Sequence, residues 1–316
     1  MHKPTRELVS AARRKLGNPY AYAEYLDTEA DQPDSSSVST EQITLSRRIL
    51  EDPYAHLGDD GELDAAPPIP KVVLSLEKPE TPHSSMAPEY QRENGDIERF
   101  ARALQIDLWE QREKLLGHSD VDPMELLDPV LALRHLGFDV ETVSSVGQFR
   151  NGNHLIEVAG QIHGDKRLVQ LSSQFPLAVR SFTAGHELGH AALGHALHGL
   201  HRDRPLDGSS SHRDIAEREA DMFAVFFLMP ARLVRRHFES RFGVGPFILN
   251  DDTAFALNGG KLEEMRVQYK SVRVLSLQLA KAESFGGRRF VSLAKLFKVS
   301  NEALAIRLEE LGLIDF

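Results

Sequence analysis

The sequence Phe182-Thr183-Ala184-Gly185-His186-Glu187-Leu188-Gly189-His190 contains two histidines four residues apart, with a glutamate directly after the first. On an α-helix, residues four apart lie on the same face, so the imidazoles of His186 and His190 can reach one ion. Neutral imidazole nitrogens suit Zn²⁺, which favours tetrahedral geometry. Glu187 is rotated by about 100° around the helix axis, from where it can reach a water molecule at the ion without ligating the ion. This spacing is the HExxH pattern of general-base hydrolysis at zinc.

The competing interpretation is a chance motif on an amphipathic helix. The chain has 14 histidines among 316 residues, so an HExxH pattern would arise by chance with a probability of roughly 0.05. Neighbouring apolar residues favour a helix from about Leu177 to His198 around the motif, and they include Phe182, Leu188, Ala191, Ala192 and Leu197.

A catalytic zinc ion usually takes three protein ligands and leaves one position open. One class of zincins supplies a histidine ten residues after the first, with a glycine three residues before it. These positions hold Ala196 and Leu193 here, which excludes that class. In the other large class the third ligand is a glutamate on a later helix. Such a helix is predicted from His212 to Leu228, where Pro230 stops it.

The later helix contains the sequence Glu217-Arg218-Glu219-Ala220-Asp221. Glu217 and Asp221 are four residues apart and share a face, so Glu217 is predicted to be the third ligand. Asp221 is predicted to accept a hydrogen bond from a ligand histidine and thereby fix its tautomer. Glu219 points elsewhere on the helix and is the second choice for the ligand. The alternative for each of these acids is a solvated helix face.

Composition excludes several classes of site. The chain has no cysteine, so disulfides, thiolate ligands and cysteine nucleophiles are impossible. A formal net charge of -10 does not favour global attraction to nucleic acid or anionic lipid. Residues 1–17 lack the apolar segment of a signal peptide, and the longest apolar stretch, Met222 to Pro230, is far shorter than the ~20 residues of a spanning helix. We expect a cytoplasmic protein without a membrane partner.

Composition and hydrophobic pattern along the chain predict four segments. Residues 1–26 are expected to form a short helix, and residues 27–94, rich in proline, serine and acids, a linker. A zinc metallopeptidase domain is expected over 95–245 and a C-terminal helical region over 246–316. The predicted elements of the metallopeptidase domain are helices near 95–115 and 122–136, a strand over 138–143, and two strands over 155–162 and 168–171 that form a hairpin.

The expected fold class is α+β: a small mixed or antiparallel sheet packed on helices, with the two motif helices flanking a cleft. The open edge of the hairpin is expected beside this cleft, where it could hold an extended peptide by strand addition. In the C-terminal region, residues 291–297 and 300–311 predict two short helices, the second capped by Ser300. This pair resembles a helix-turn-helix, and two interpretations remain open for it, a packing element or a DNA reader.

The stretches Phe182–His190, Glu217–Ala224 and Leu228-Met229-Pro230 resemble the ImmA/IrrE family of metallopeptidases. The resemblance is strong over about 120–230 and weak in the tail from Leu293 to Ile314. It implies Zn²⁺ held by His186, His190 and Glu217, with Glu187 as the catalytic base. It also implies cleavage of a helix-turn-helix repressor that switches on stress, phage-defence or mobile-element genes. Some members of the family respond to DNA damage or single-stranded DNA.

Other charged residues are open to two interpretations. One of the histidines between the motif helices could donate a hydrogen bond to the oxyanion of the tetrahedral intermediate, and the alternative for each is a solvent-facing position; these histidines are His195, His198, His201 and His212. A basic cluster follows the second motif helix and is either a solvated face or a contact for nucleic acid or substrate; it comprises Arg232, Arg235, Arg236 and Arg241.

Two rival functions remain at the level of sequence. A membrane-associated zincin with the same ligands is disfavoured by the lack of a transmembrane segment. A non-enzymatic regulator that binds a repressor or DNA through the same fold is disfavoured by Glu187, because a pure binder would not need a general base.

Overall fold

The structure is a computed structural model that describes residues 92–118, 120–151, 154–195, 201–202, 215–243 and 245–315. The helix predicted over 1–26 and nearly all of the predicted linker lie outside the described residues. Two compact units are present: the first contains 92–176 and 180–228 of the described chain, and the second contains 177–179 and 229–315.

The first unit begins with helices that bury one apolar face. In the helix α5, the buried residues Ile97, Ala101, Leu104 and Leu108 recur at helical spacing. The single helix predicted over 122–136 is wrong, because Asp128 has an extended backbone and Pro129 after it disfavours a helical conformation there. Asp128 instead caps the next helix by accepting a hydrogen bond from the Val130 amide. The elements are α5 (Asn94–Glu110), α6 (Arg112–Leu116), the 3-10 helix η2 (Pro123–Leu127) and α7 (Pro129–His135).

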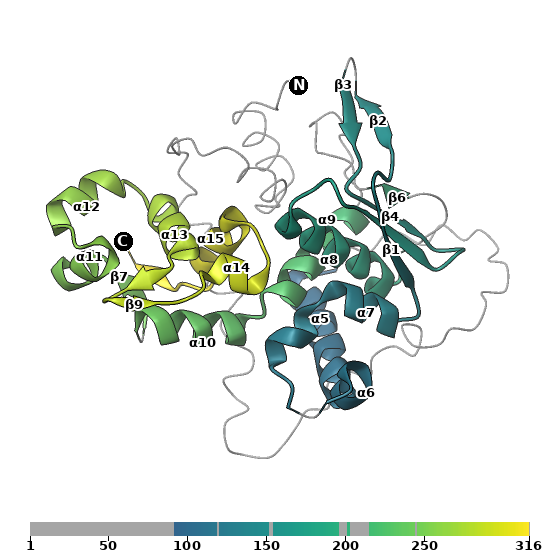
Figure 1. Ribbon diagram of the computed structural model, residues 1–316, viewed down its shortest axis with the longest axis horizontal. Helices are drawn as coiled ribbons and strands as arrows, with labels where there is room; N and C mark the ends of the chain where they lie inside the picture. Colours follow the sequence, from purple (N-terminus) through teal and green to yellow (C-terminus); the bar gives the residue numbers. More distant parts are fainter. Residues whose placement is uncertain are drawn as a thin grey trace. The chain divides into compact units, whose positions relative to one another are not determined.

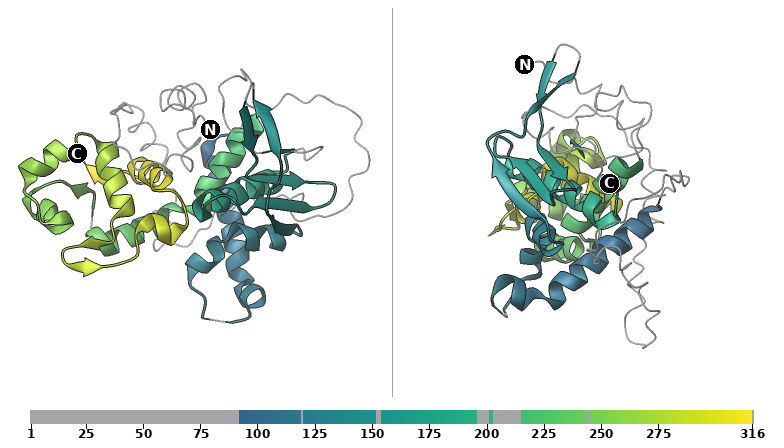
Figure 2. Two further views of the ribbon diagram at one scale, coloured as in Figure 1. Left: turned by 45° about the horizontal axis from the view of Figure 1, so that its top comes forward. Right: turned by 90° about the vertical axis from the view of Figure 1, so that its right-hand side faces the viewer.

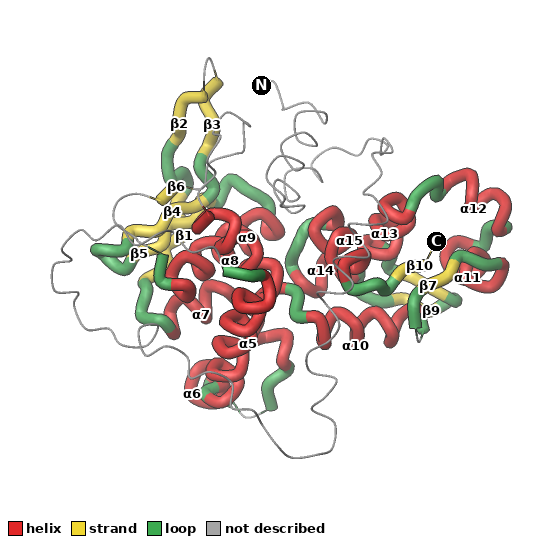
Figure 3. The backbone as a smooth tube through the Cα atoms, turned by 180° about the vertical axis from the view of Figure 1, so that it is seen from behind, coloured by secondary structure: helices red, strands yellow, loops and turns green. Residues whose placement is uncertain are grey.

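A four-stranded mixed sheet follows, in the order β1-β5-β4-β6. Its strands are β1 (Asp139–Val143), β4 (Gly160–His163), β5 (Leu168–Ser172) and β6 (His201–Arg202). The hairpin of β4 and β5 confirms the predicted pairing, while β1 lies parallel to β5. The strand predicted over 155–162 is divided, because Val158 and Ala159 separate β4 from β3 (His154–Glu157), which pairs with β2 (Gln148–Asn151). In Figure 3 the strands of this unit lie on one side and α5, α7, α8 and α9 on the other.

The predicted open edge of the hairpin is wrong. Strand β5 is flanked by β1 on one side and by β4 on the other. Strand β4 pairs on its second side with β6, through Gln161 with Arg202 and Ile162 with His201. Both edges of the hairpin therefore have partners, because two segments distant in sequence join the same sheet. Figure 2 shows β2 and β3 as a separate ribbon that extends away from this sheet.

Two long helices, α8 (Leu177–Leu193) and α9 (Ile215–Leu228), complete the first unit. The helix α8 ends before the predicted His198, because Gly194 adopts a left-handed conformation with φ 66°. The two helices approach very closely: a Cβ atom built on Gly189 would lie 2.8 Å from both Cα and the carbonyl oxygen of Ala220. On the sheet side, a Cβ atom on Gly160 of β4 would overlap Thr183 of α8. Figure 1 shows α8 and α9 beside the sheet.

The second unit is mainly helical. Its core contains an aromatic cluster in which Phe242 contacts Phe238, Phe247, Phe285 and Phe290. The helices are α10 (Ala231–Phe242), α11 (Asp251–Asn258), α12 (Leu262–Gln268), α13 (Val272–Lys281), α14 (Leu293–Phe297) and α15 (Asn301–Glu310). The strands form two short pairs, β7 (Phe247–Ile248) with β10 (Ile314–Asp315) and β8 (Ser284–Phe285) with β9 (Arg288–Arg289).

The two short helices predicted in the tail are present as α14 and α15. Ser300 caps α15 as expected, since its hydroxyl accepts a hydrogen bond from the Ala303 amide at 3.0 Å. Every residue of α15 from Glu302 to Glu309 is buried. A buried helix does not present a row of side chains to a DNA groove, so this burial favours the packing interpretation of the pair. No helix in the described part of the chain is long and apolar enough to cross a membrane.

Candidate metal centre

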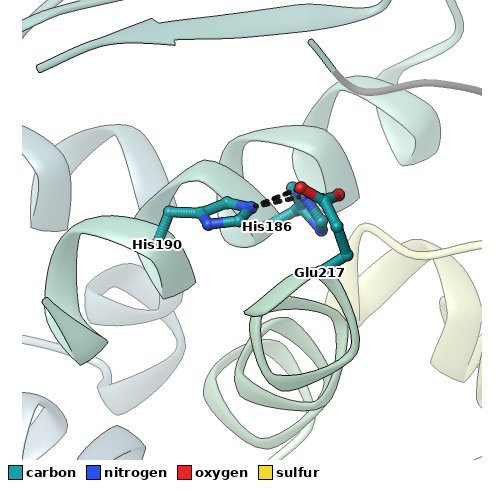
Figure 4. A group of neighbouring side chains, drawn as sticks. All are labelled: His186, His190 and Glu217. Carbon is teal, nitrogen blue, oxygen red and sulfur yellow. Dashed lines mark hydrogen bonds and ion pairs between the residues drawn. The ribbon is translucent and has the colours of Figure 1, made fainter. Parts of the chain in front are cut away.

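The side chains of His186, His190 and Glu217 converge on one point in the first unit. The two histidines lie one turn apart on α8, and Glu217 lies in the first turn of α9 (Figure 4). The Nε2 atoms of His186 and His190 are 3.0 Å apart. One oxygen of Glu217 lies 3.4 Å from Nε2 of His186, and the other lies 3.5 Å from Nε2 of His190. Among the described residues, these three form the one group that has the composition and spacing of a metal site.

These spacings fit a tetrahedral zinc site. Ligand atoms at about 2.0–2.1 Å from a tetrahedral ion lie about 3.3–3.4 Å from one another. The separation of 3.0 Å between the two Nε2 atoms, and those of 3.4 and 3.5 Å from them to different oxygens of Glu217, lie near that value. Both histidines are buried, whereas the side chain of Glu217 retains 20% of its exposure. The group can therefore supply two nitrogen donors and one oxygen donor, with access to solvent on the side of Glu217.

Asp221 fixes the orientation of His186. Its carboxylate lies 2.8 Å from Nδ1 of His186, on the side of the ring opposite Nε2. In the neutral ring, a hydrogen on Nδ1 would point at the carboxylate and leave the lone pair on Nε2. Burial alone would lower the pKa of His186, but the hydrogen bonds and charges of Asp221 and Glu217 raise that pKa well above its usual value. The same carboxylates that favour a protonated imidazole also favour a metal cation in this place.

His190 has a different partner. Nδ1 of His195 lies 3.0 Å from Nδ1 of His190, and Nε2 of His195 lies 3.2 Å from a carboxylate oxygen of Glu219. Burial lowers the pKa of His195, against the opposing effect of Glu219. For Glu219, burial alone would raise the pKa, but the hydrogen bonds from the backbone and guanidinium of Arg92 hold it below its usual value. Sequence reasoning did not find Arg92, which lies 127 positions from Glu219 and carries no local signal.

Glu187 is adjacent to the metal-site group without belonging to it. It is 1% exposed and lies on α8 directly after His186. Because successive helix residues are rotated by about 100° around the helix axis, Glu187 does not lie on the face that His186 and His190 share. Glu187 is therefore a neighbour of His186 in the sequence that is not counted among the three ligand residues.

The remaining predicted site residues fall in different places. His198 and His212 lie outside the described residues, and His201 is described only through its backbone in β6. Both ring nitrogens of His195 face protein groups. In the basic cluster, Arg232 and Arg236 are exposed, whereas Arg241 packs over the ring of Phe290 and donates to backbone carbonyl oxygens. Arg241 is therefore held by protein contacts, whereas Arg232 and Arg236 on the same helix face solvent.

Comparison with known proteins gives one result. Residues 140–243 match the family model Peptidase_M78, the IrrE N-terminal-like domain. The matched segment contains α8 and α9, and so all three residues of the metal-site group. The match confirms the resemblance to an ImmA/IrrE-type family and indicates a metallopeptidase-like domain. No curated protein and no solved structure gives a significant match to the chain.

Proposed function

We propose that this chain is a zinc-dependent endopeptidase. His186, His190 and Glu217 would hold the ion, and Glu187 would act as the general base. The observation that carries the proposal is the meeting of two imidazole nitrogens and a carboxylate within 3.5 Å, inside the segment that matches a peptidase family. Zinc is the ion chosen because the donor set of two nitrogens and one oxygen, with tetrahedral spacing, is that of catalytic zinc sites.

Each ligand has a distinct task in this proposal. The buried imidazoles of His186 and His190 present their Nε2 lone pairs, and Asp221 keeps the proton of His186 on Nδ1. Glu217 supplies the negative charge that offsets part of the charge of a divalent cation. When bound, the ion would act as a Lewis acid on the scissile carbonyl and on a water molecule.

Glu187 would move the proton. Its carboxylate would take a proton from the attacking water and later deliver it to the nitrogen of the leaving amine. Positioned general acid–base groups of this kind contribute about 10²–10⁴-fold to a rate. The position of Glu187 supports this role, because it lies directly after His186 on α8 and its carboxylate is shielded from bulk water.

The substrate we propose is a helix-turn-helix transcriptional repressor, whose cleavage in the cytoplasm would derepress stress, phage-defence or mobile-element genes. Single-stranded DNA is the proposed activating signal. Both proposals rest on what the resemblance of Phe182–His190 and Glu217–Ala224 to the ImmA/IrrE family implies. The burial of α15 argues that any contact with DNA uses another surface.

The experiment is to incubate the zinc-loaded protein with the repressor encoded beside it and to look for one defined cut by mass spectrometry. We expect cleavage that stops when a chelator removes the metal and returns when zinc is added. An intact repressor, with zinc bound to the protein, would reject this substrate. Cleavage that persists without metal would reject the metallopeptidase.

A further inference from the structure

The end of α8 turns one more histidine back toward the metal centre. Gly194 takes the left-handed conformation, and the His195 amide then donates to the carbonyl oxygen of His190 at 3.1 Å. This turn brings the two rings together, with centroids 5.0 Å apart and planes at 73°. The side chain of His195 keeps only 6% of its exposure, so water has little access to its hydrogen bonds. His195 therefore occupies a defined position behind His190.

Which ring nitrogens carry hydrogens follows if Nε2 of His190 must keep its lone pair for the ion. If Nε2 of His190 presents a lone pair, its Nδ1 carries the hydrogen. That hydrogen faces Nδ1 of His195 at 3.0 Å, which must then accept. The remaining hydrogen of a neutral His195 is on Nε2, and the nearest acceptor is the carboxylate of Glu219 at 3.2 Å. One arrangement of hydrogens thus satisfies both of these contacts, from His190 to His195 and from His195 to Glu219.

Glu219 is itself held in place. The backbone amide of Arg92 donates to one carboxylate oxygen at 2.7 Å, and the guanidinium donates to the other. The same guanidinium donates to the carbonyl oxygen of Leu193 at 3.0 Å, at the end of α8. Its Nη1 atom also lies 3.5 Å from Nε2 of His195, a longer contact than the one from His195 to Glu219. Arg92 therefore ties Glu219 to the last turn of the helix that carries both histidines.

We infer that His195 and Glu219 are positioning residues of the metal centre, which fix His190 with its Nε2 lone pair directed at the ion. This inference rests on the proposed metal site. Neither residue would touch the ion or the substrate. Asp221 contacts the ligand His186 directly, whereas Glu219 contacts the ligand His190 through the neutral imidazole of His195.

The assignment replaces two roles that the sequence left open. Glu219 was the second choice for the third ligand, yet its two oxygens face Arg92 and His195. His195 was a candidate oxyanion donor, yet its one hydrogen is used toward Glu219 in the arrangement above. Groups that hold a ligand histidine typically change metal affinity by 10–100-fold when they are removed.

The test compares zinc affinities measured by competition with a fluorescent chelator, using the full chain. His195→Phe keeps a ring but removes both hydrogen bonds, and we expect a 10–100-fold weaker affinity for zinc. His195→Gln retains an acceptor for His190 and a donor for Glu219, so we expect it to restore most of the affinity. His118→Phe is the matched control, since His118 lies outside the group with 47% of its side chain exposed, and it should leave the affinity unchanged.

Glu219→Gln is the second variant, and it tests the inference even if His195→Phe does not fold. It should also weaken zinc binding, and, where His195→Phe folds, combining the two should cost less affinity than the product of their separate effects. Nitrogen-15 NMR of the histidine rings gives an independent readout: Nδ1 of His190 should carry the hydrogen in the zinc-loaded wild type. Wild-type affinity in folded His195→Phe or in Glu219→Gln would overturn the inference and leave the proposed metallopeptidase standing. A wild-type protein that binds no zinc would overturn both.

Discussion

At the scale of single residues, Glu187 separates an enzyme from a binding protein. Glu187→Gln keeps nearly the same volume and polarity but cannot accept a proton. We expect repressor cleavage to fall by at least ~10²-fold, since general-base catalysis contributes about 10²–10⁴-fold, while zinc stays bound. The measurement is the rate of cleavage in a single-turnover assay, alongside zinc content. A variant that reproduces the full cellular response would favour the non-enzymatic regulator instead.

The residues of the site differ in how far the sequence could predict them. His186, Glu187 and His190 stand in one short motif, and Glu217 with Asp221 repeats the helical spacing four residues apart, so local pattern sufficed to nominate them. The structure then brings His186, His190 and Glu217 together. The group of Arg92, His195 and Glu219 depends on contacts between segments up to 127 positions apart. No local spacing encodes such a contact, so only the folded chain shows it.

At the scale of secondary structure, the close approach of α8 and α9 places Glu217 beside the two histidines. Gly189→Ala would put a methyl group against the backbone of Ala220, which cannot rotate away. We expect a loss of about 1–3 kcal/mol in the free energy of unfolding, together with weaker zinc binding because α9 carries Glu217. Chemical denaturation and chelator competition measure the two effects.

The matched control for this substitution is Gly95→Ala in α5. A Cβ atom on Gly95 meets nothing within 4 Å, and replacing a helical glycine by alanine is usually neutral or stabilising. If Gly189→Ala is as stable as Gly95→Ala and binds zinc equally well, the helices do not need this close contact. The placement of Glu217 would then have another cause.

Helices and strands could be predicted from the sequence where the pattern that specifies them is local. The hairpin of β4 and β5 follows from two short apolar runs around a polar turn, and Ser300 is a capping residue at the start of α15. The open hairpin edge failed because β1 and β6 join from segments distant in sequence. The end of α8 was misplaced because the apolar spacing continues to Leu197, whereas Gly194 takes the left-handed conformation that ends the helix.

At the scale of the whole molecule, every residue assigned to the metal centre lies at or after Arg92. Deletion of residues 1–91 should therefore leave zinc affinity within about twofold of wild type, which falls below the 10–100-fold effects of residues that hold a ligand. A deletion of residues 1–94 also removes Arg92 and should weaken zinc binding, since Glu219 loses its partner. Isothermal titration of both truncated proteins with zinc measures the difference. Equal zinc affinities of the two truncated proteins would mean that Arg92 does not support the metal centre. A weaker zinc affinity after deletion of residues 1–91 would mean that these residues contribute to the site.

The central claim concerns the ion and its three ligands, and elemental analysis of purified protein tests it most directly. The wild type should contain about one zinc ion per chain, as one group of three protein ligands implies. His186→Ala and Glu217→Ala should lose most of that zinc because each removes a ligand, whereas Glu187→Gln should retain it. Unchanged zinc in His186→Ala would place the metal elsewhere and contradict the site described here.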